Sequence, residues 1–384
     1  MSTFRYYAIV FACFMALIGW SAGAFSDPWN GDAEVCSQSA KTVYQSCQLG
    51  VAADATLATA NCFDQPDPET RRACFVNVKT EVGEERELCR EQRGARLDVC
   101  DLVGEGRYQD PLSDPNIVFV HPDDIGVSYP KNAYVDLAVG HTYVLRAGED
   151  FEETVVVHVT DQIREAEGFS GPVYCRVVVD VVLVAEQNGG GESEWVAAEV
   201  TDDYLAQDEE GNVYYCGEIA RNFENGFLDN LDGSFFTGLN GAKAGVLLRQ
   251  NPMVGQVDRQ EYALNEAEDV VEYLALDAAP DVDEGGQNPN APEFQCAGNG
   301  MGDCLMTRDF SALSPGDSEF KFYKKEVGFV LAVALEDGEF TGEREELVCV
   351  GESLDVLNEP ACGIDNPEEL LDNLCALSPL ALCQ

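Results

Sequence analysis

Histidine and basic residues are scarce in this 384-residue chain. It has 3 histidines, and 23 lysines and arginines against 70 aspartates and glutamates, which gives a formal net charge of −47. A surface of this charge repels nucleic-acid phosphates and anionic lipids, so we expect no nucleic-acid partner and no stable membrane insertion. The histidines, His121, His141 and His158, do not lie at the ligand spacing of a zinc or copper site.

Motifs that mark common catalytic sites are also missing. The sequence has no Gly-x-Ser-x-Gly elbow, no phosphate-binding loop and no HExxH motif. A carboxylate pair of the glycosidase kind needs no local motif, but in a chain with 70 acids a pair of acids is no signal by itself. The sequence therefore favours a non-enzymatic protein, and a hydrolase remains the alternative.

The one long apolar run lies at the N-terminus. It extends from Tyr6 to Trp20 behind Arg5, and the small residues Ala22-Gly23-Ala24 follow it. This order is typical of a secretory signal peptide, so residues 1–24 are predicted to be removed. The run is short for a membrane span of about 20 residues, and no cysteine stands at the cleavage step to carry a lipid. We expect an exported protein, either secreted or located in the periplasm or cell envelope.

Cysteine, in contrast, is abundant, and six cysteines lie symmetrically within residues 25–104. The position numbers of the outer, middle and inner pairs each total 136, as paired positions in an antiparallel hairpin do. The flanks 32–62 and 68–103 are rich in helix-forming residues, and Asp67 is placed to cap the second helix ahead of Pro68. The spacing is too wide for zinc. We predict a helical hairpin with the disulfides Cys36–Cys100, Cys47–Cys89 and Cys62–Cys74.

Basic residues are concentrated in this predicted hairpin. They include Arg71, Arg72, Arg86, Arg90, Arg93 and Arg96. Because opposite charges attract, we expect the hairpin to dock on the acidic remainder of the chain or on an acidic partner protein.

After a linker at residues 105–116, the hydrophobic period changes from helical to alternating. Strands are expected at 154–160, 172–184, 194–206, 245–249, 257–262, 269–276, 304–310, 319–325 and 328–335. The sequence thus predicts an α+β protein in which residues 117–350 form a curved antiparallel β-sheet, as a half-barrel or a sandwich. Residues 277–304 have no periodicity and are expected to be an inserted surface loop. The tail 351–384 should begin a short helix, capped by Asn366, that packs on the sheet.

The acidic stretch "DDYLAQDEEGNVYYCGE" (202–218) is predicted to be a hairpin. Its acids Asp208, Glu209 and Glu210 are expected at the loop tip, where water solvates charge easily. A calcium loop is the alternative, and it would need ligand oxygens at alternate positions around a fixed glycine. Calcium is therefore the one cofactor left open.

The remaining cysteines leave several pairings open. We expect Cys296–Cys304. In a simple meander one strand would separate Cys175 from Cys216, a gap of about 9.6 Å, which is too wide for a disulfide. That pair would need another strand order, or each cysteine bonds a covering segment. The pairing of Cys349, Cys362, Cys375 and Cys383 is also open.

Between residues 132 and 350, the order of motifs resembles an uncharacterised family of secreted bacterial β-rich proteins. The motifs are "YLAQDEEGNVYYCGE", "FENG", "GLNGAKAGVLLRQNPMVGQVDRQEYALNEAEDVVEYLAL" and "FSALSPGDSEFKFYKKEVGFV". The resemblance implies a single curved antiparallel sheet and export, and it brings no established activity. This chain differs in having Cys216 where an aromatic residue is usual, the insert 277–304, and the cysteine-rich hairpin and tail.

The least ordinary group of polar residues lies in "NGAKAG…VDRQEY…NEAED". Gly241 and Gly245 flank Lys243 in a loop that would let the backbone approach a ligand closely. The other candidate ligand-binding residues are Arg259, Gln260, Glu261, Tyr262, Glu268 and Asp269. If the hairpin between them closes, they could form a polar pocket at the mouth of the sheet; the alternative is an ordinary salt-bridged hairpin.

The sequence supports three hypotheses for function. The first is an exported, acidic, non-enzymatic binding or envelope-associated structural protein whose curved sheet holds a small or lipid-like ligand. The second is a secreted hydrolase that uses Glu261 and Glu268. The third is a calcium-dependent surface protein. The partner, a small molecule or a protein, is not identified by any motif.

Overall fold

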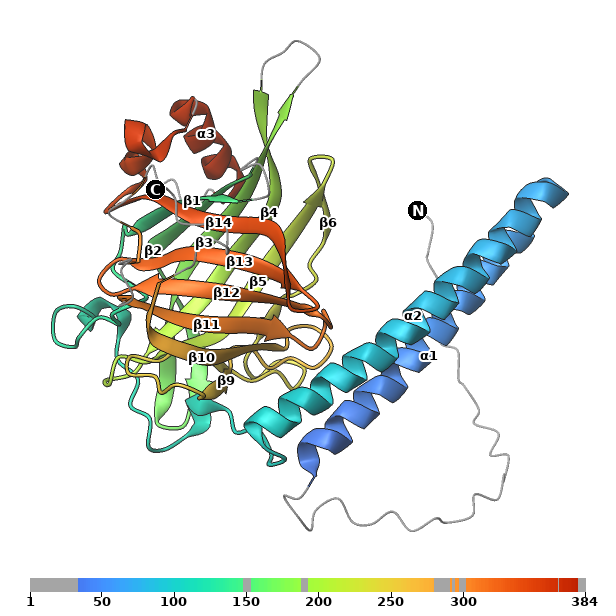
Figure 1. Cartoon of the computed structure of the whole chain (residues 1–384), viewed down its shortest axis with the longest axis horizontal. Helices are drawn as coiled ribbons and strands as arrows, with labels where there is room; N and C mark the ends of the chain where they lie inside the picture. The colour runs from blue at the N-terminus through green and yellow to red at the C-terminus, as the bar shows by residue number, and fades with distance from the viewer. Residues whose placement is uncertain are drawn as a thin grey trace, which may run out of the picture.

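A computed structural model describes residues 34–147, 153–187, 193–279, 291, 294–296, 302–364 and 366–378. The predicted signal peptide, most of the predicted insert 277–304 and Cys383 lie outside the described residues. A long helical hairpin comes first, followed by one large sheet with a helical segment at its C-terminal end (Figure 1). The α+β fold class is therefore confirmed. Within the described residues, no helix is both long and apolar enough to cross a membrane.

The helical hairpin consists of α1 (Val35–Phe63) and α2 (Pro68–Val103). The side chain of Asp67 accepts hydrogen bonds from the backbone N–H groups of Glu69 and Thr70, at 3.0 and 2.8 Å, so it caps α2 as expected. The structure joins Cys36 to Cys100, Cys47 to Cys89 and Cys62 to Cys74, the pairs expected from the symmetric spacing. Two helices alone bury little apolar surface, and these covalent links compensate for that.

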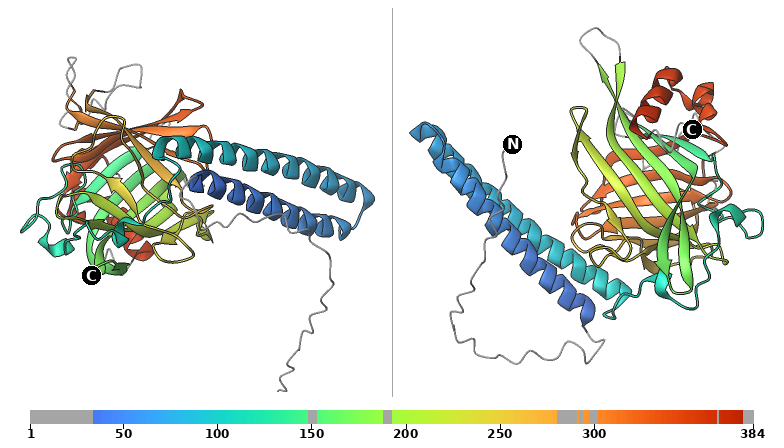
Figure 2. Two further views of the ribbon diagram at one scale, coloured as in Figure 1. Left: turned by 90° about the horizontal axis from the view of Figure 1, so that it is seen from below. Right: turned by 180° about the vertical axis from the view of Figure 1, so that it is seen from behind.

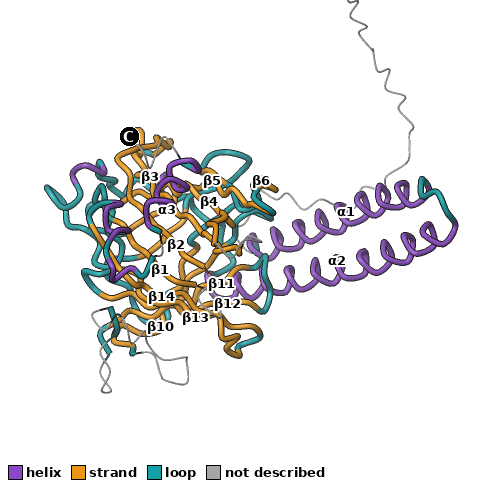
Figure 3. Tube along the Cα trace, turned by 90° about the horizontal axis from the view of Figure 1, so that it is seen from above, coloured by secondary structure: helices purple, strands orange, loops and turns teal. Residues whose placement is uncertain are grey.

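The hairpin does not lie along the sheet. It projects away from the body, and only its base contacts the sheet near β9 (Figures 2 and 3). A helix of 36 residues is about 54 Å long, so most of α2 faces solvent. The hairpin therefore docks on the rest of the chain through its base, where Arg96 pairs with Glu268; an acidic partner protein stays a prediction.

The sheet contains fourteen strands among the described residues. Their bounds are β1 (Thr142–Ala147), β2 (Glu153–Gly168), β3 (Gly171–Gln187), β4 (Ser193–Gln207), β5 (Val213–Glu224), β6 (Phe227–Asn230), β7 (Phe235–Phe236), β8 (Gly245–Leu248), β9 (Val257–Arg259), β10 (Asp269–Ala278), β11 (Cys304–Ser311), β12 (Asp317–Lys324), β13 (Gly328–Glu336) and β14 (Glu339–Gly351). The order is β6-β5-β4-β3-β2-β1-β14-β13-β12-β11-β10-β9, and β7 and β8 both pair with β5.

The sheet is continuous and strongly curled, so that β3 and β4 lie behind β12 and β13 (Figure 1). It is one sheet and not two packed sheets, which matches the first of the two predicted alternatives. A backbone bridge between Lys243 and Tyr262 joins the chain next to β8 to the chain after β9. We call this place, where the two ends of the sheet meet, the seam.

Four strands were missed by the sequence pattern, the short β6 and β7 and the pair β1 and β14. β1 and β14 pair with each other and connect the two halves of the sheet. β14 reads "EFTGEREELVCVG", and its many charges conceal the alternation that would predict a strand.

The acidic stretch 202–218 is a hairpin between β4 and β5, but one of its acids is not at the solvated tip. Asp208 is buried, and its carboxylate accepts hydrogen bonds from the backbone N–H of Asn212 at 2.8 Å and from the hydroxyl of Tyr214 at 2.8 Å. The expectation for Asp208 was therefore wrong. Its carboxylate organises the turn as an internal hydrogen-bond acceptor.

The pair Cys175–Cys216 is bonded even though the strands form a simple meander. The two Cα atoms lie 6.6 Å apart, with β4 between their strands. Two irregularities reduce the flat-sheet distance: the β3–β4 ladder ends at Arg176–Leu205, just before Cys175, and the register between β4 and β5 shifts at Cys216. The argument from strand spacing was wrong because it assumed a regular sheet, whereas a bulge bends its strand.

The C-terminal segment covers one face of the sheet. It comprises the short helices η4 (Leu354–Asn358) and η5 (Pro360–Cys362) and the helix α3 (Pro367–Leu377). Leu370 and Leu374 are fully buried against the apolar face of β3 and β4, and Cys349–Cys362 ties the segment to β14. Asn366 is not a side-chain cap for the backbone as predicted; its amide donates to Glu369 instead. Cys375 is also disulfide-bonded.

Candidate binding site at the junction of hairpin and sheet

A pocket of about 250 Å³ lies where the base of the helical hairpin meets the sheet. We call it the junction pocket. It is lined by residues from α1, α2, the linker after α2 and the segment from β9 to β10. Those with polar or aromatic side chains include Arg96, Arg107, Tyr108, Arg259, Tyr262 and Glu268.

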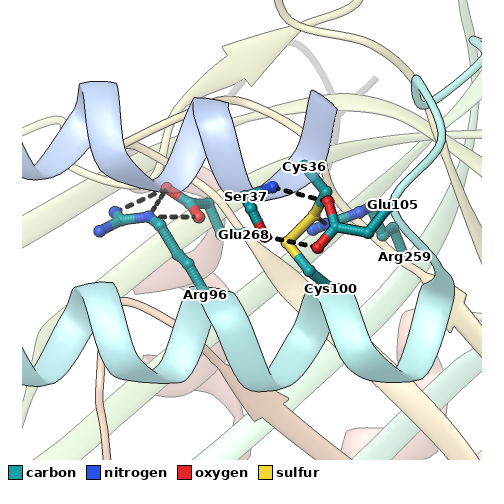
Figure 4. Close-up of a disulfide and its surroundings, with 7 residues drawn as sticks. All are labelled: Cys36, Ser37, Arg96, Cys100, Glu105, Arg259 and Glu268. Atoms are coloured by element: carbon teal, nitrogen blue, oxygen red, sulfur yellow. Dashed lines mark hydrogen bonds and ion pairs between the residues drawn. A yellow bond between two sulfur atoms is a disulfide. The ribbon is translucent and has the colours of Figure 1, made fainter. Parts of the chain in front are cut away.

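An ion pair between Arg96 and Glu268 holds the hairpin to the sheet on one side of this pocket (Figure 4). The guanidinium donates three hydrogen bonds to the carboxylate: Nε to Oε2 at 2.9 Å and to Oε1 at 3.1 Å, and Nη2 to Oε1 at 2.8 Å. The exposed fractions are 4% and 2%, so water does not screen the pair. The backbone N–H of Asn265 also donates to Glu268 at 2.6 Å. Glu268 is therefore neutralised by Arg96 and is not available as a free carboxylate.

Arg259 has no such partner. Its side chain is 9% exposed, its Nε has no hydrogen-bond partner, and Nη2 contacts only Sγ of Cys36, at 3.5 Å. The guanidinium carbon lies 5.3 Å from the ring centre of Tyr262 and 6.0 Å from that of Tyr108. Burial lowers the pKa of Arg259, but a guanidinium stays charged in proteins. Among the described residues, the pocket thus contains a buried cation to which no carboxylate is hydrogen-bonded.

The aromatic wall of the pocket carries further positive charge. The rings of Tyr108 and Tyr262 are stacked, with centres 4.8 Å apart. Nζ of Lys243 lies 5.0 Å from the Tyr262 ring centre and donates to the backbone oxygen of Tyr108 at 2.6 Å. Burial lowers the pKa of Lys243, while the charge of Asp110 raises it. Three arginines against one glutamate line the pocket, so it is positive within a strongly negative chain.

A bulge places Arg259 and Tyr262 on the same side. In a regular strand, residues three apart face opposite sides. Here the backbone N–H groups of Gln260 and Glu261 both donate to the carbonyl of Asp269, at 2.8 and 3.2 Å. Gln260 and Glu261 therefore both lie opposite Asp269, as in a β-bulge. After the bulge, the alternation of side chains between the two faces is shifted by one residue.

The seven predicted site residues consequently divide into two groups. Lys243, Arg259, Tyr262 and Glu268 surround the junction pocket, whereas Gln260, Glu261 and Asp269 face the interior of the curled sheet. The glycine loop has a different role from the predicted one. A Cβ on Gly245 would lie 1.9 Å from the carbonyl oxygen of Gln260, so this close approach is to the chain itself and not to a ligand.

Sequence reasoning missed Arg96, Arg107 and Tyr108 as site residues. They belong to the hairpin and the linker, which the pattern treats as separate units. The one available signal was the concentration of arginines in the hairpin. It predicted a docking function but not which arginine would meet the sheet.

The interior of the curled sheet has the opposite charge. A hollow of about 840 Å³ is lined by residues of β4 and of β10 to β14, including seven acids and one lysine, Lys321. Nζ of Lys321 lies 3.2 Å from Glu319 and 3.7 Å from Asp309, so it is shared between two carboxylates. A neighbouring hollow of about 440 Å³ adds Asp180 and Glu345. We call the larger space the acidic hollow.

Three groups joined by hydrogen bonds, Asp203, Tyr215 and Glu218, add two more acids near the seam. The hydroxyl of Tyr215 lies within hydrogen-bond distance of both Asp203 and Glu218, at 2.9 Å from the latter. A phenol has one proton to donate, so a second proton must lie on one of the carboxyls when both hydrogen bonds form. Burial is the main cause that raises the pKa of Asp203 to about 7 and that of Glu218 to about 8.

One group of residues has the spacing of metal ligands in the described part of the chain. It consists of Cys296, Asp303 and Cys304. The two sulfurs form the disulfide Cys296–Cys304, and a disulfide offers no thiolate to a metal. The group therefore does not support a thiolate-bound metal centre.

Comparisons with known proteins assign no family. No family model matches the chain, and no curated protein matches it. A Bacteroides fragilis protein that is described as exported, with a YMCC-like fold, aligns with 58% of this chain and 98% of its own. The identity is 11% and the TM-score 0.25, which is too low to carry an argument. The resemblance to secreted bacterial proteins therefore stays a prediction.

Proposed function

We propose that this protein is an exported, non-enzymatic binding protein that holds a small organic anion in the junction pocket. The observation that carries the proposal is Arg259, a buried guanidinium whose Nε has no hydrogen-bond partner in the described part of the chain. Burying an uncompensated charge is costly. An anionic ligand would remove that cost, and it would meet few competing carboxylates because Glu268 is paired with Arg96.

The shape and chemistry of the pocket support a particular class of ligand. Guanidinium groups bind carboxylate, sulfate or phosphate groups with two parallel hydrogen bonds. The stacked rings of Tyr108 and Tyr262 offer a flat apolar surface beside the charge. A volume of about 250 Å³ is below the usual range for drug-sized ligands. An aromatic or short-chain carboxylate is of the right size.

The disulfides support export. Six are present between described cysteines, and disulfides persist in oxidising compartments outside the cytosol.

The arrangement does not favour the hydrolase alternative. Glu268 is held by Arg96, whereas the charged groups nearest to Glu261 are Asp269, Glu218 and Asp203. The two proposed catalytic carboxylates therefore have separate surroundings.

Titration calorimetry with acetate, phosphate, sulfate and 4-hydroxybenzoate tests the proposal. We expect the unmodified protein to bind the aromatic carboxylate best, and Arg259→Gln to weaken that binding at least tenfold. Arg90→Gln is the matched control, because Arg90 lies on the exposed part of α2, with 53% of its side chain exposed. Equal binding by both variants, or no binding of any anion by the unmodified protein, would contradict the proposal.

A further inference from the structure

The interior of the curled sheet contains a carboxylate that the junction pocket does not use. Glu261 is 8% exposed, and among the described residues its side chain forms no hydrogen bond and no ion pair. The groups that act on its charge are Asp269, Glu218 and Asp203, and then Lys321. Asp269 and Lys321 line the acidic hollow, and the backbone N–H of Glu261 donates to the carbonyl of Asp269 at 3.2 Å, so Glu261 lies next to that lining.

The local cation supply is too small for these acids. Lys321 is already shared between Asp309 and Glu319. The other carboxylates near Glu261 have neutral donors, since Asp203 and Glu218 share the hydroxyl of Tyr215. A buried carboxylate without a partner is unfavourable. Among the described residues, the interior therefore offers no cation that pairs with Glu261 once its carboxyl is ionised.

The acidic hollow has an entrance of the same sign. Asp269, Asp317, Glu336 and Glu343 line it and are exposed, whereas Asp309 is buried and lies deeper. Acids thus extend from the rim of the hollow towards Glu261. Walls of one sign concentrate counter-ions and guide them inwards.

The dimensions favour an organic cation over a single metal ion. About 840 Å³ is far more than one ion needs. Among the described residues, the acids of the hollow do not converge as metal ligands do. Lys321, an aliphatic ammonium held between two carboxylates, shows the type of group that this lining accommodates.

We propose that the acidic hollow binds an aliphatic polyamine, with one ammonium group paired to Glu261 and Asp269 and another near the rim. The site lies on the opposite side of the β9–β10 segment from the junction pocket, and neither site requires the other to be occupied. An ammonium group supplies three hydrogen-bond donors, which suits carboxylates that stand apart from one another.

Titration calorimetry with spermidine at pH 8 and fixed ionic strength tests this proposal. The unmodified protein is expected to show saturable binding of one spermidine. Glu261→Gln and Asp269→Asn should each weaken it at least tenfold. Glu84→Gln, a change of the same charge on the exposed face of α2, should leave it unchanged. Circular dichroism confirms that each variant is folded, and the two interior variants serve as checks on each other.

Three results would overturn the proposal. Non-saturable binding, or an equal effect of all three variants, would show that spermidine only screens the net charge of the chain. Binding of calcium as tight as that of spermidine, with the same loss in Glu261→Gln, would identify a metal site instead. Absence of any spermidine binding would leave the hollow without the proposed ligand.

Discussion

The two sides of the segment from Arg259 to Asp269 differ in the sign of their buried charges and in whether these charges have a partner. On the side of the hairpin, Glu268 has a buried partner and Arg259 lies beside the stacked rings of Tyr108 and Tyr262. On the interior side, Glu261 has no hydrogen-bond or ion-pair partner among the residues that the structure describes, and acids outnumber cations in the lining of the acidic hollow. A single bulge at Gln260–Glu261 separates these environments. The comparison shows that residues adjacent in sequence can serve sites of opposite charge.

The largest expected effect on stability comes from breaking the ion pair between Arg96 and Glu268. Glu268→Gln removes the negative charge that compensates Arg96 and leaves a buried guanidinium uncompensated. We expect the free energy of unfolding to fall by about 3 kcal/mol, the lower end for a broken buried pair. Guanidinium chloride unfolding with the disulfides intact measures it. A double variant with Arg96→Met should recover most of the loss; a single-variant loss below about 0.5 kcal/mol would show that the pair contributes little.

Because of the carboxyls on the interior side, we expect the free energy of unfolding to fall as the pH rises. The pKa values of Asp203, Glu218 and Glu345 are raised to about 7, 8 and 7, mainly by burial. Unfolded carboxyls ionise near pH 4. Between pH 6.5 and 8.5 the folded state therefore binds more protons than the unfolded state, and raising the pH destabilises it.

We expect a loss of about 2 kcal/mol across that range. The groups that face Asp203 and Glu218 are Tyr215, Glu199 and Asp269. Urea unfolding at several pH values measures the slope, and Glu218→Gln should reduce it. A flat or rising profile would mean that the interior carboxyls ionise normally.

Glu261→Gln should change the free energy of unfolding in the opposite direction to Glu268→Gln. The amide carries no charge, so it avoids repulsion from Asp269, Glu218 and Asp203. Burial and the neighbouring acids raise the pKa of the native carboxyl, so we expect a gain of about 1 kcal/mol at pH 8 and a smaller gain at pH 4, near the pKa of an unfolded carboxyl. Parallel denaturant unfolding at the two pH values is the measurement. Destabilisation at pH 8 would reveal a partner for Glu261.

The smallest effect is expected for Arg259→Met. Methionine fills a similar space beside the stacked rings of Tyr108 and Tyr262 without an unpaired charge. The free energy of unfolding should stay within about 1 kcal/mol of the unmodified protein or rise slightly. Anion binding should nevertheless be lost. A loss of stability in the ligand-free protein would show that the guanidinium is structural.

The sequence predicted the hairpin better than the site. Its evidence was local, because helix periodicity, the Asp67 cap and symmetric cysteines describe neighbours along two antiparallel helices. The candidate site depended on which face each residue of "RQEY" would occupy. Strict alternation would place Arg259 and Tyr262 on opposite faces. They share one face because of a bulge, which is formed with Asp269, a residue of the next strand.

The sequence by itself determined the excess of acid, the helical hairpin and the antiparallel strands on either side of the acidic turn. These follow from composition, period and spacing, which act over short distances along the chain. Only the tertiary structure decided that Arg96 would meet Glu268, that Cys175 would reach Cys216 across a strand, and that Arg259 and Glu261 would face opposite sides. These arrangements depend on sheet curvature and bulges, which arise from contacts between segments far apart in sequence.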